Sequence, residues 1–442
     1  MMPKIPHTIA ALLQALRFRN PQTGPLAALQ DSQWNELLSF CDLMHLTLLL
    51  GRACPDVLPC WVRSRIEQNF ADNVQHFERV KATYSEVAQA LLENAVECLV
   101  IKGFAQCPDF VEDPRLRPQS DIDLFCLRES VFKARNTLLG LGYVADDALE
   151  RRGYQLELEV APERLPSDHL PLMTRKTNWQ WQGNFFDPEI PVGVELHFRF
   201  LNEHFTRFSP PGLDRFWERR VDRSLDEIRF VGLSPADNLA YVCLHVLSDL
   251  QGGAWIIKAA LELAGFLHHS ANNDSFWQRW QELHNERLRG FEAVAFRVAT
   301  ELFPCDMSDH ARAEIERLPA PIQEWFRLFA YSPLERVFRP NKDFLWLHVA
   351  MLESRRDRLA IVRQTLLPSR VPPIDLPGQD TNPQGQPRKF WPSQRYAKYG
   401  FFLALRVSHH GRALVSSLWH GFLWWLGSKD SEKSSAGFIV NC

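Results

Sequence analysis

The chain has 442 residues, of which 45% are hydrophobic, and its 50 basic and 53 acidic residues leave a net charge of −3. A chain of this length holds two or three domains with cores of their own. Bulk charge gives no reason to expect a nucleic-acid partner, although it leaves a local basic patch open.

The nine cysteines are odd in number, scattered along the chain, and form no C-x-x-C pair. This pattern argues against a zinc site and favours reduced thiols, which are typical of cytoplasmic proteins. The start of the sequence shows no long apolar run of the kind found in secretory signals. The sequence contains no stretch of about 18 uncharged apolar residues, so no membrane-spanning helix is predicted. We therefore expect a cytoplasmic protein without a membrane span.

Residues 1–97 predict an N-terminal helical region. Asp31-Ser32 precedes an apolar run and predicts a helix start. The segment 61–95 predicts one or two long helices, because its apolar residues recur at helical spacing; among them are Val80, Tyr84, Val87 and Leu91.

Residues 98–232 predict an α/β core. Strands are expected at 98–101, 121–127, 154–160 and 191–198, and helices at 104–110 and 130–141. The first strand ends at Lys102-Gly103. On the last strand Glu195 and His197 share one face, because side chains alternate along a strand.

Residues 233–367 predict a C-terminal helical domain. Ser234-Pro235-Ala236-Asp237 is a strong helix start, and this helix should run to about residue 249. Further helices are expected at 255–268, 276–303 and 321–338. A loop at 368–390, an aromatic helix at 391–427 and a disordered tail at 428–442 should follow. The aromatic helix has two interpretations, core packing or docking on a membrane surface or partner protein.

Asp121 and Asp123 lie two residues apart on the predicted strand 121–127, so their carboxylates share a face. Neighbouring carboxylates repel one another, and a divalent cation such as Mg²⁺ or Mn²⁺ relieves that repulsion. The alternative is a pair of solvated acids at a strand edge. The glycine at 103 and a third carboxylate at Glu195 favour the metal, since three carboxylates can hold two ions for phosphoryl transfer.

Three runs carry a resemblance to a known family: Leu99-Val100-Ile101-Lys102-Gly103, Arg117 to Leu124, and Val194 to Arg199. Over about residues 30–370 the chain resembles the uncharacterised bacterial nucleotidyltransferases of the polymerase-β-like superfamily. The resemblance implies an α+β fold, with a mixed sheet in the nucleotidyltransferase core and helical regions on either side.

The resemblance also implies roles for single residues. Asp121 and Asp123 would bridge two Mg²⁺ ions, or Mn²⁺ ions, on a nucleoside triphosphate, and Glu195 would be the third carboxylate and a candidate general base. Gly103 would lie against the triphosphate. The remaining nucleotide-binding candidates are Lys102, Arg117 and Ser120, of which the first two would neutralise phosphate charge.

The sequence departs from the wider superfamily at two places. Lys102-Gly103 stands where Gly-Ser or Gly-Gly is usual, so a hydroxyl contact to phosphate is missing, and Glu262 stands where the family tends to have an aspartate. Several assignments stay open. Glu189 or Glu203 could replace Glu195, and Arg115 could replace Arg117. The alternative role of Arg117 is a structural pair with Asp121. Lys102 is equally well a surface lysine. His197 is best interpreted as a hydrogen-bonded structural histidine, and His245 as a satisfied core histidine.

We therefore predict a metal-dependent nucleotidyltransferase that moves NMP from an NTP, ATP among them, to an acceptor hydroxyl and releases pyrophosphate. The acceptor is open between protein, sugar, small molecule and RNA end. Two alternatives are a metal-dependent glycosyltransferase and a non-catalytic nucleotide-binding or assembly partner on the same fold.

Overall fold

The structure is a computed structural model that describes residues 5–145, 165–252, 256–367 and 407–429. The chain divides into two compact units, residues 5–318 and residues from 319 onward. The predicted strand at 154–160 and the predicted loop at 368–390 lie outside the described residues. So do residues 391–406 of the predicted aromatic helix and residues 430–442 of the predicted tail.

A seven-stranded sheet in the first unit has the order β3-β4-β5-β2-β1-β7-β6. It is mixed, because β2 pairs with β5 and β1 with β7 in parallel, whereas the other pairs are antiparallel. The strands are β1 (Cys98–Val100), β2 (Asp121–Cys126), β3 (Tyr143–Ala145), β4 (Met173–Arg175), β5 (Gly193–His197), β6 (Val221–Leu225) and β7 (Ile228–Gly232). The predicted α+β class with a mixed sheet is confirmed.

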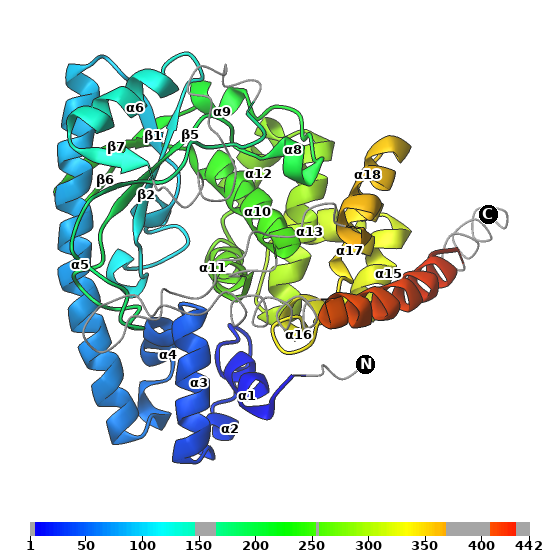
Figure 1. Cartoon of the computed structure of the whole chain (residues 1–442). Helices are drawn as coiled ribbons and strands as arrows, with labels where there is room; N and C mark the ends of the chain where they lie inside the picture. Colours follow the sequence, from blue (N-terminus) through cyan, green and yellow to red (C-terminus); the bar gives the residue numbers. More distant parts are fainter. Residues whose placement is uncertain (1–4, 146–164, 253–255, 368–406, 430–442) are drawn as a thin grey trace, which may run out of the picture. The chain divides into compact units, whose positions relative to one another are not determined.

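One face of the sheet is apolar and covered by helices (Figure 1). Helix α5 (Cys60–Glu93) is a single helix of 34 residues, about 50 Å long at 1.5 Å per residue. Its buried stripe includes Val80, Tyr84 and Val87, and α6 (Val131–Gly140) packs beside it. The sheet contributes Ile122 and Leu124, so the alternate residues Asp121 and Asp123 fall on the opposite face.

Short helices precede α5 in the chain: α1 (His7–Ala15), α2 (Gly24–Ala27), α3 (Asp31–Leu43), α4 (Thr47–Ala53) and the 3-10 turn η1 (Pro55–Val57). The predicted helix start at Asp31 is confirmed. The predicted helix at 104–110 is replaced by the 3-10 turn η2 (Gly103–Gln106), and η3 (Pro114–Leu116) precedes β2.

A second helical group follows the sheet in the same unit. It consists of α8 (Glu203–Thr206), α9 (Arg215–Glu218), α10 (Pro235–Gly252), α11 (Ile256–His269), α12 (Asp274–Leu283), α13 (Glu286–Leu302) and α14 (Asp309–Glu316). Helix α10 begins at Pro235 as predicted. Phe125 of β2 stacks on Phe200, whose ring also lies 6.2 Å from Tyr241 of α10. These aromatic contacts join the polar face of the sheet to α10.

Strands β3, β4, β6 and β7 were not predicted. Strands β3 and β4 have three residues each, too few for a clear alternating pattern, whereas β7 does alternate in burial and was missed. Strand β6 is an edge strand whose residues are mainly exposed, so it lacks an apolar face to recognise.

The second unit contains α15 (Ala320–Phe329), α16 (Ser332–Glu335), α17 (Phe344–Met351), α18 (Arg355–Leu366) and a helix at 407–429. Trp424 of the last helix is buried, stacks on Trp346 and donates Nε1–H to the carbonyl of Pro321 at 2.7 Å. Trp419 and Phe422 are exposed. Core packing therefore explains part of this aromatic helix, and docking by the exposed part stays a prediction. No helix in the described ranges is long and apolar enough to cross a membrane.

A fully buried charged network anchors α10 to α12 and α13. His284 lies between Glu292, 3.0 Å from Nδ1, and Asp237, 3.3 Å from Nε2. Burial opposes the imidazolium charge, but the two carboxylates outweigh it and raise the pKa of His284 from 6.5 to about 9. Trp280 donates to Glu292 and Ser234 to Asp237, so the acceptor oxygens are further satisfied.

We expect this network to make stability depend on pH. Because the folded pKa of His284 is raised, its contribution is complete below pH 6.5 and is lost as pH rises through about 9. The shift corresponds to roughly 3 kcal/mol of unfolding free energy. Denaturant unfolding should be measured at pH 6.5 and at pH 9. Between these two values the native chain should lose more unfolding free energy than His284→Gln. Equal losses in the two proteins would contradict the assignment.

Candidate functional site

The parallel pairing of β2 with β5 builds the polar centre of the sheet. Its register places Asp123 beside Glu195 and Asp121 beside Gly193. Neighbouring residues of paired strands point to the same face. The two carboxylates that were predicted to act together are thus adjacent, although they are far apart in the sequence.

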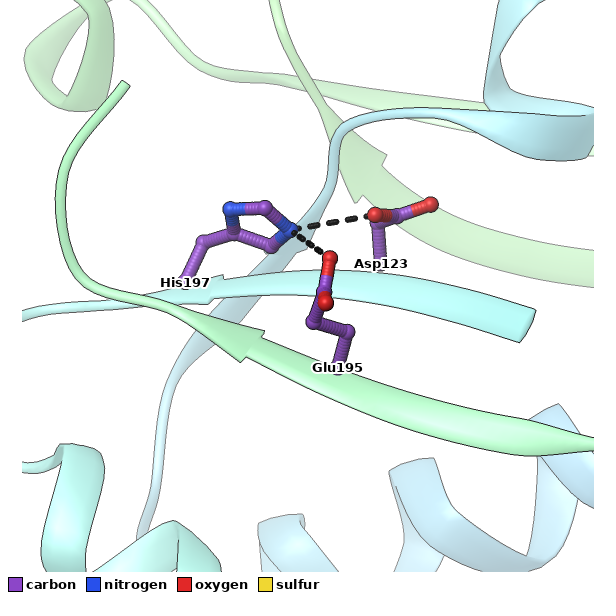
Figure 2. Close-up of side chains that lie close together, drawn as sticks. All are labelled: Asp123, Glu195 and His197. Carbon is purple, nitrogen blue, oxygen red and sulfur yellow. Dashed lines mark hydrogen bonds and ion pairs between the residues drawn. The ribbon is translucent and has the colours of Figure 1, made fainter. Parts of the chain in front are cut away.

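Asp123, Glu195 and His197 form a compact cluster (Figure 2). Each offers one possible ligand atom, and these atoms lie within 4.8 Å of one another. His197 Nε2 lies 3.0 Å from Asp123 Oδ1 and 2.9 Å from Glu195 Oε2, so the ring bridges the carboxylates. The interpretation of His197 as a hydrogen-bonded histidine is confirmed.

Lys102 is the second cation of the cluster. Its Nζ lies 2.8 Å from Asp123 Oδ1 and 3.9 Å from Glu195 Oε2, and its side chain is only 18% exposed. The alternative of a simple surface lysine is therefore wrong. Burial disfavours the ammonium, but Asp123 and other neighbours outweigh it and hold the pKa of Lys102 well above its usual value.

The carboxylates differ in their ionisation. Burial would raise the pKa of Asp123, but Lys102 and His197 hold it well below its usual value. Asp121 makes no such ion pair among the described contacts, and burial together with Asp123 raises its pKa to about 6. Burial and Lys102 lower the pKa of His197, yet its bonds to Asp123 and Glu195 raise it to about 9. A cation beside Asp121 would lower its pKa again.

Gly103 begins η2 next to this cluster. Its φ of +62° is in the left-handed region, which favours glycine. A Cβ there would lie 2.2 Å from Nε2 of Gln119, which donates to the carbonyl of Asp121 at 2.7 Å. The antiparallel pairing of β1 with β2 brings the end of β1 to the start of β2, so this turn is adjacent to the aspartates.

The other predicted nucleotide-binding residues lie outside the cluster. Arg117 pairs with Glu262, whose Oε1 is 3.0 Å from its Nε, and both side chains are largely buried. The alternative that Arg117 pairs with Asp121 is thereby replaced. Glu262, whose role was open, is the ion-pair partner of Arg117. Ser120 is exposed.

The residues considered as alternatives to Glu195 and Arg117 form ion pairs outside the cluster or lie on another helix. Glu189 pairs with Arg79 at 2.9 Å, and Glu203 begins α8. Arg115 pairs with Asp113 at 2.8 Å. His245, interpreted as a core histidine, is only half-buried and pairs with Asp249 at 3.1 Å. Glu195 is therefore the acid that joins Asp123.

Two residues of the site were missed from the sequence. His169 precedes β4, and its Nδ1 lies 3.0 Å from Glu195 Oε1. Lys258 of α11 is half-buried, and burial followed by repulsion from Arg117 lowers its pKa to about 8. Burial, Lys258 and Arg117 also lower the pKa of His45 to about 3. Arg117 opposes the rise in the pKa of Asp121, and Asp121 opposes the fall in that of Lys258, so both cations act electrostatically on this aspartate.

The comparison with protein families matches residues 30–304, more than half of the chain, to the family described as "Uncharacterised nucleotidyltransferase". The chain belongs to this nucleotidyltransferase family. Neither the curated proteins nor the solved structures contain a match. The matched range includes the whole sheet and the cluster on β2 and β5.

The side chains of the cluster fit a divalent cation. Carboxylate oxygens are the ligands that Mg²⁺ and Mn²⁺ prefer, and Asp123 and Glu195 supply them within one cluster. Burial, followed by the charge of Asp123, raises the pKa of Asp121 beside them. His197 replaces Asp121 in the compact cluster; the role of Asp121 as a ligand stays a prediction.

Gly103→Ala should weaken both folding and the site. The added Cβ requires a left-handed backbone at a cost of about 1–2 kcal/mol, and it displaces Gln119 from the carbonyl of Asp121. We expect a lower melting temperature than for Gly140→Ala, a helical glycine with open space around it. A Gly103→Ala protein as stable as this control would show that the turn tolerates a side chain.

Proposed function

We propose that this protein is a polymerase-β-like nucleotidyltransferase that transfers NMP from an NTP to an acceptor hydroxyl and releases pyrophosphate. The observation that carries the proposal is the register of β2 and β5, which joins Asp123 to Glu195 beside the glycine turn at Gly103. The family match supports nucleotidyl transfer over the glycosyltransferase alternative.

Asp121, Asp123 and Glu195 would hold one or two Mg²⁺ or Mn²⁺ ions. Such ions neutralise triphosphate charge and lower the pKa of an attacking hydroxyl. The side chains around them have separate tasks. Lys102 and His197 keep Asp123 ionised and fix its orientation, since each donates to the same carboxylate oxygen.

Gly103 would lie against the triphosphate through its backbone, in a left-handed turn that favours glycine. Lys258 would supply positive charge to the phosphates, since Arg117 is already paired with Glu262. In the transfer, the acceptor oxygen bonds to the α-phosphorus while the bond from that phosphorus to the bridging oxygen breaks. Pyrophosphate leaves with the electron pair, and Glu195 accepts the hydroxyl proton as general base.

Asp123→Asn tests the proposed reaction. With an α-labelled NTP panel, a cell extract as the source of acceptors and Mg²⁺ or Mn²⁺, the native protein should transfer label. The rate of label transfer by the variant should be lower by roughly a hundredfold or more, as expected when one preorganised electrostatic group is removed. Asp222→Asn, at an exposed position of β6, is the matched control and should keep its activity.

Far-UV circular dichroism of both variants checks the fold. Undiminished label transfer by Asp123→Asn would refute the catalytic role of the cluster. NTP binding without transfer to any acceptor class would instead support the non-catalytic nucleotide-binding protein.

Lys258→Met should raise the KM for the NTP by about tenfold, the effect of losing roughly 1.4 kcal/mol of binding. Its kcat should change less, because the side chain is expected to hold phosphates in both the bound substrate and the transition state. Lys133→Met, at an exposed position of α6, is the control. An unchanged KM in Lys258→Met would exclude the lysine from the nucleotide site.

A further inference from the structure

A cavity of about 230 Å³ opens next to the carboxylate cluster. Glu195 and His197 line both the cluster and this cavity, which we call the β5–α10 pocket. Its other walls come from the segment before β4, the segment that follows β5, and one side of α10. A molecule in the β5–α10 pocket therefore has Glu195, the proposed general base, within its wall.

One ring nitrogen of His197, which lines this pocket, has no hydrogen-bond partner within the described residues. Its Nε2 contacts the two carboxylates, whereas Nδ1 is buried and makes no hydrogen bond within the described residues. Figure 2 shows Nδ1 on the side of the ring away from Asp123 and Glu195. The distance from Nδ1 to Asp168 Oδ2 is 3.8 Å, too long for a hydrogen bond. A buried polar nitrogen of this kind is costly unless a ligand or water satisfies it.

The cations of the β5–α10 pocket are already engaged by carboxylates. Its lining contains the carboxylates of Asp168 and Glu195 but no arginine, and its lysine, Lys102, and its histidine His197 lie 2.8 Å and 3.0 Å from Asp123. Phosphate groups are usually recognised by arginine, lysine or helix N-termini. A phosphorylated small molecule or the end of a nucleic acid therefore lacks a partner in this wall.

The remaining walls suit a small ring with hydroxyl groups. Leu201, Phe205 and Leu244 supply apolar surface, and Ser248 and His245 supply polar groups. The volume lies below the roughly 300–1,000 Å³ that is common for drug-sized ligands. The space is thus sufficient for one ring rather than for a polymer segment.

We propose that the β5–α10 pocket binds the acceptor, and that the acceptor is a small hydroxyl-bearing ring without phosphate or carboxylate groups, such as a single sugar unit. The ring packs against the apolar wall and presents one hydroxyl to Glu195, which accepts its proton when the oxygen bonds to the α-phosphorus. This inference rests on the proposed nucleotidyl transfer.

A panel of acceptors tests the chemical class. With α-labelled ATP and Mg²⁺, the protein is given glucose, galactose, N-acetylglucosamine and glucosamine, each beside its 6-phosphate, together with a short oligoribonucleotide. We expect label on at least one unphosphorylated sugar, and its kcat/KM should exceed that of the matched phosphate by about tenfold or more. Preference for the phosphates or the oligoribonucleotide would overturn the inference, as would label on none of these sugars.

Ser248→Trp tests the location, because it fills the pocket from α10. We expect kcat/KM for the labelled sugar to fall by at least about thirtyfold, since steric exclusion removes binding of the acceptor. Stabilisation by Mg²⁺-ATP in thermal unfolding should persist. Ser64→Trp, at an exposed position of α5, introduces the same side chain elsewhere and should leave transfer unchanged.

Asp168→Lys provides a second test that does not depend on filling the pocket. The backbone carbonyl of Asp168 accepts the bond from the amide of Phe198 at 2.9 Å, so that contact does not depend on the side chain. The variant replaces a negative by a positive charge in the pocket wall. The kcat/KM for the 6-phosphate, divided by the kcat/KM for the unphosphorylated sugar, should therefore rise about tenfold.

The outcomes separate the two proposals. Two results would count against nucleotidyl transfer itself. One is that Mg²⁺-ATP does not stabilise the native protein against thermal unfolding, and the other is that no acceptor of any class in a cell extract receives label. Full transfer by Ser248→Trp, or an unchanged acceptor ratio in Asp168→Lys, would overturn only the assignment of the pocket.

Discussion

The site depends on one electrostatic constraint, the placement of Asp123 next to Glu195 by the parallel pairing of β2 and β5. Two carboxylates this close and this buried repel one another unless cations join them. Lys102 and His197 provide that charge on one side, since both contact both carboxylates. A divalent ion would complete the compensation around Asp121.

The fold supports this concentration of charge by separating it from the apolar core. Alternation along β2 sends Ile122 and Leu124 to the helices α5 and α6, and the aspartates to the opposite face. Buried aromatic contacts, such as Phe125 on Phe200, hold that face against the helical group. The carboxylates are therefore held on a rigid sheet, which favours accurate positioning of reacting groups.

Sequence patterns predicted the longest elements and the chemistry of the strands. The helical segment at 61–95, the start of α10 and the shared face of Asp121 and Asp123 all follow from periodicity and capping residues. Short edge strands such as β6 were missed because they carry no apolar alternation. Side-chain partners across long sequence distances were missed too. The pairing of Arg117 with Glu262 and the approach of His169 to Glu195 require elements to meet that no local pattern connects.

The sequence by itself determined which residues could carry the chemistry, because the spacing of acids on a strand decides the face they occupy. Only the tertiary structure decided which of them act together. It brought His197 rather than Asp121 into the compact cluster with Asp123 and Glu195, and it placed Lys102 on Asp123. The physical reason is that strand register and the packing of α10 set distances of a few ångströms. Electrostatic interactions between buried groups depend on those distances.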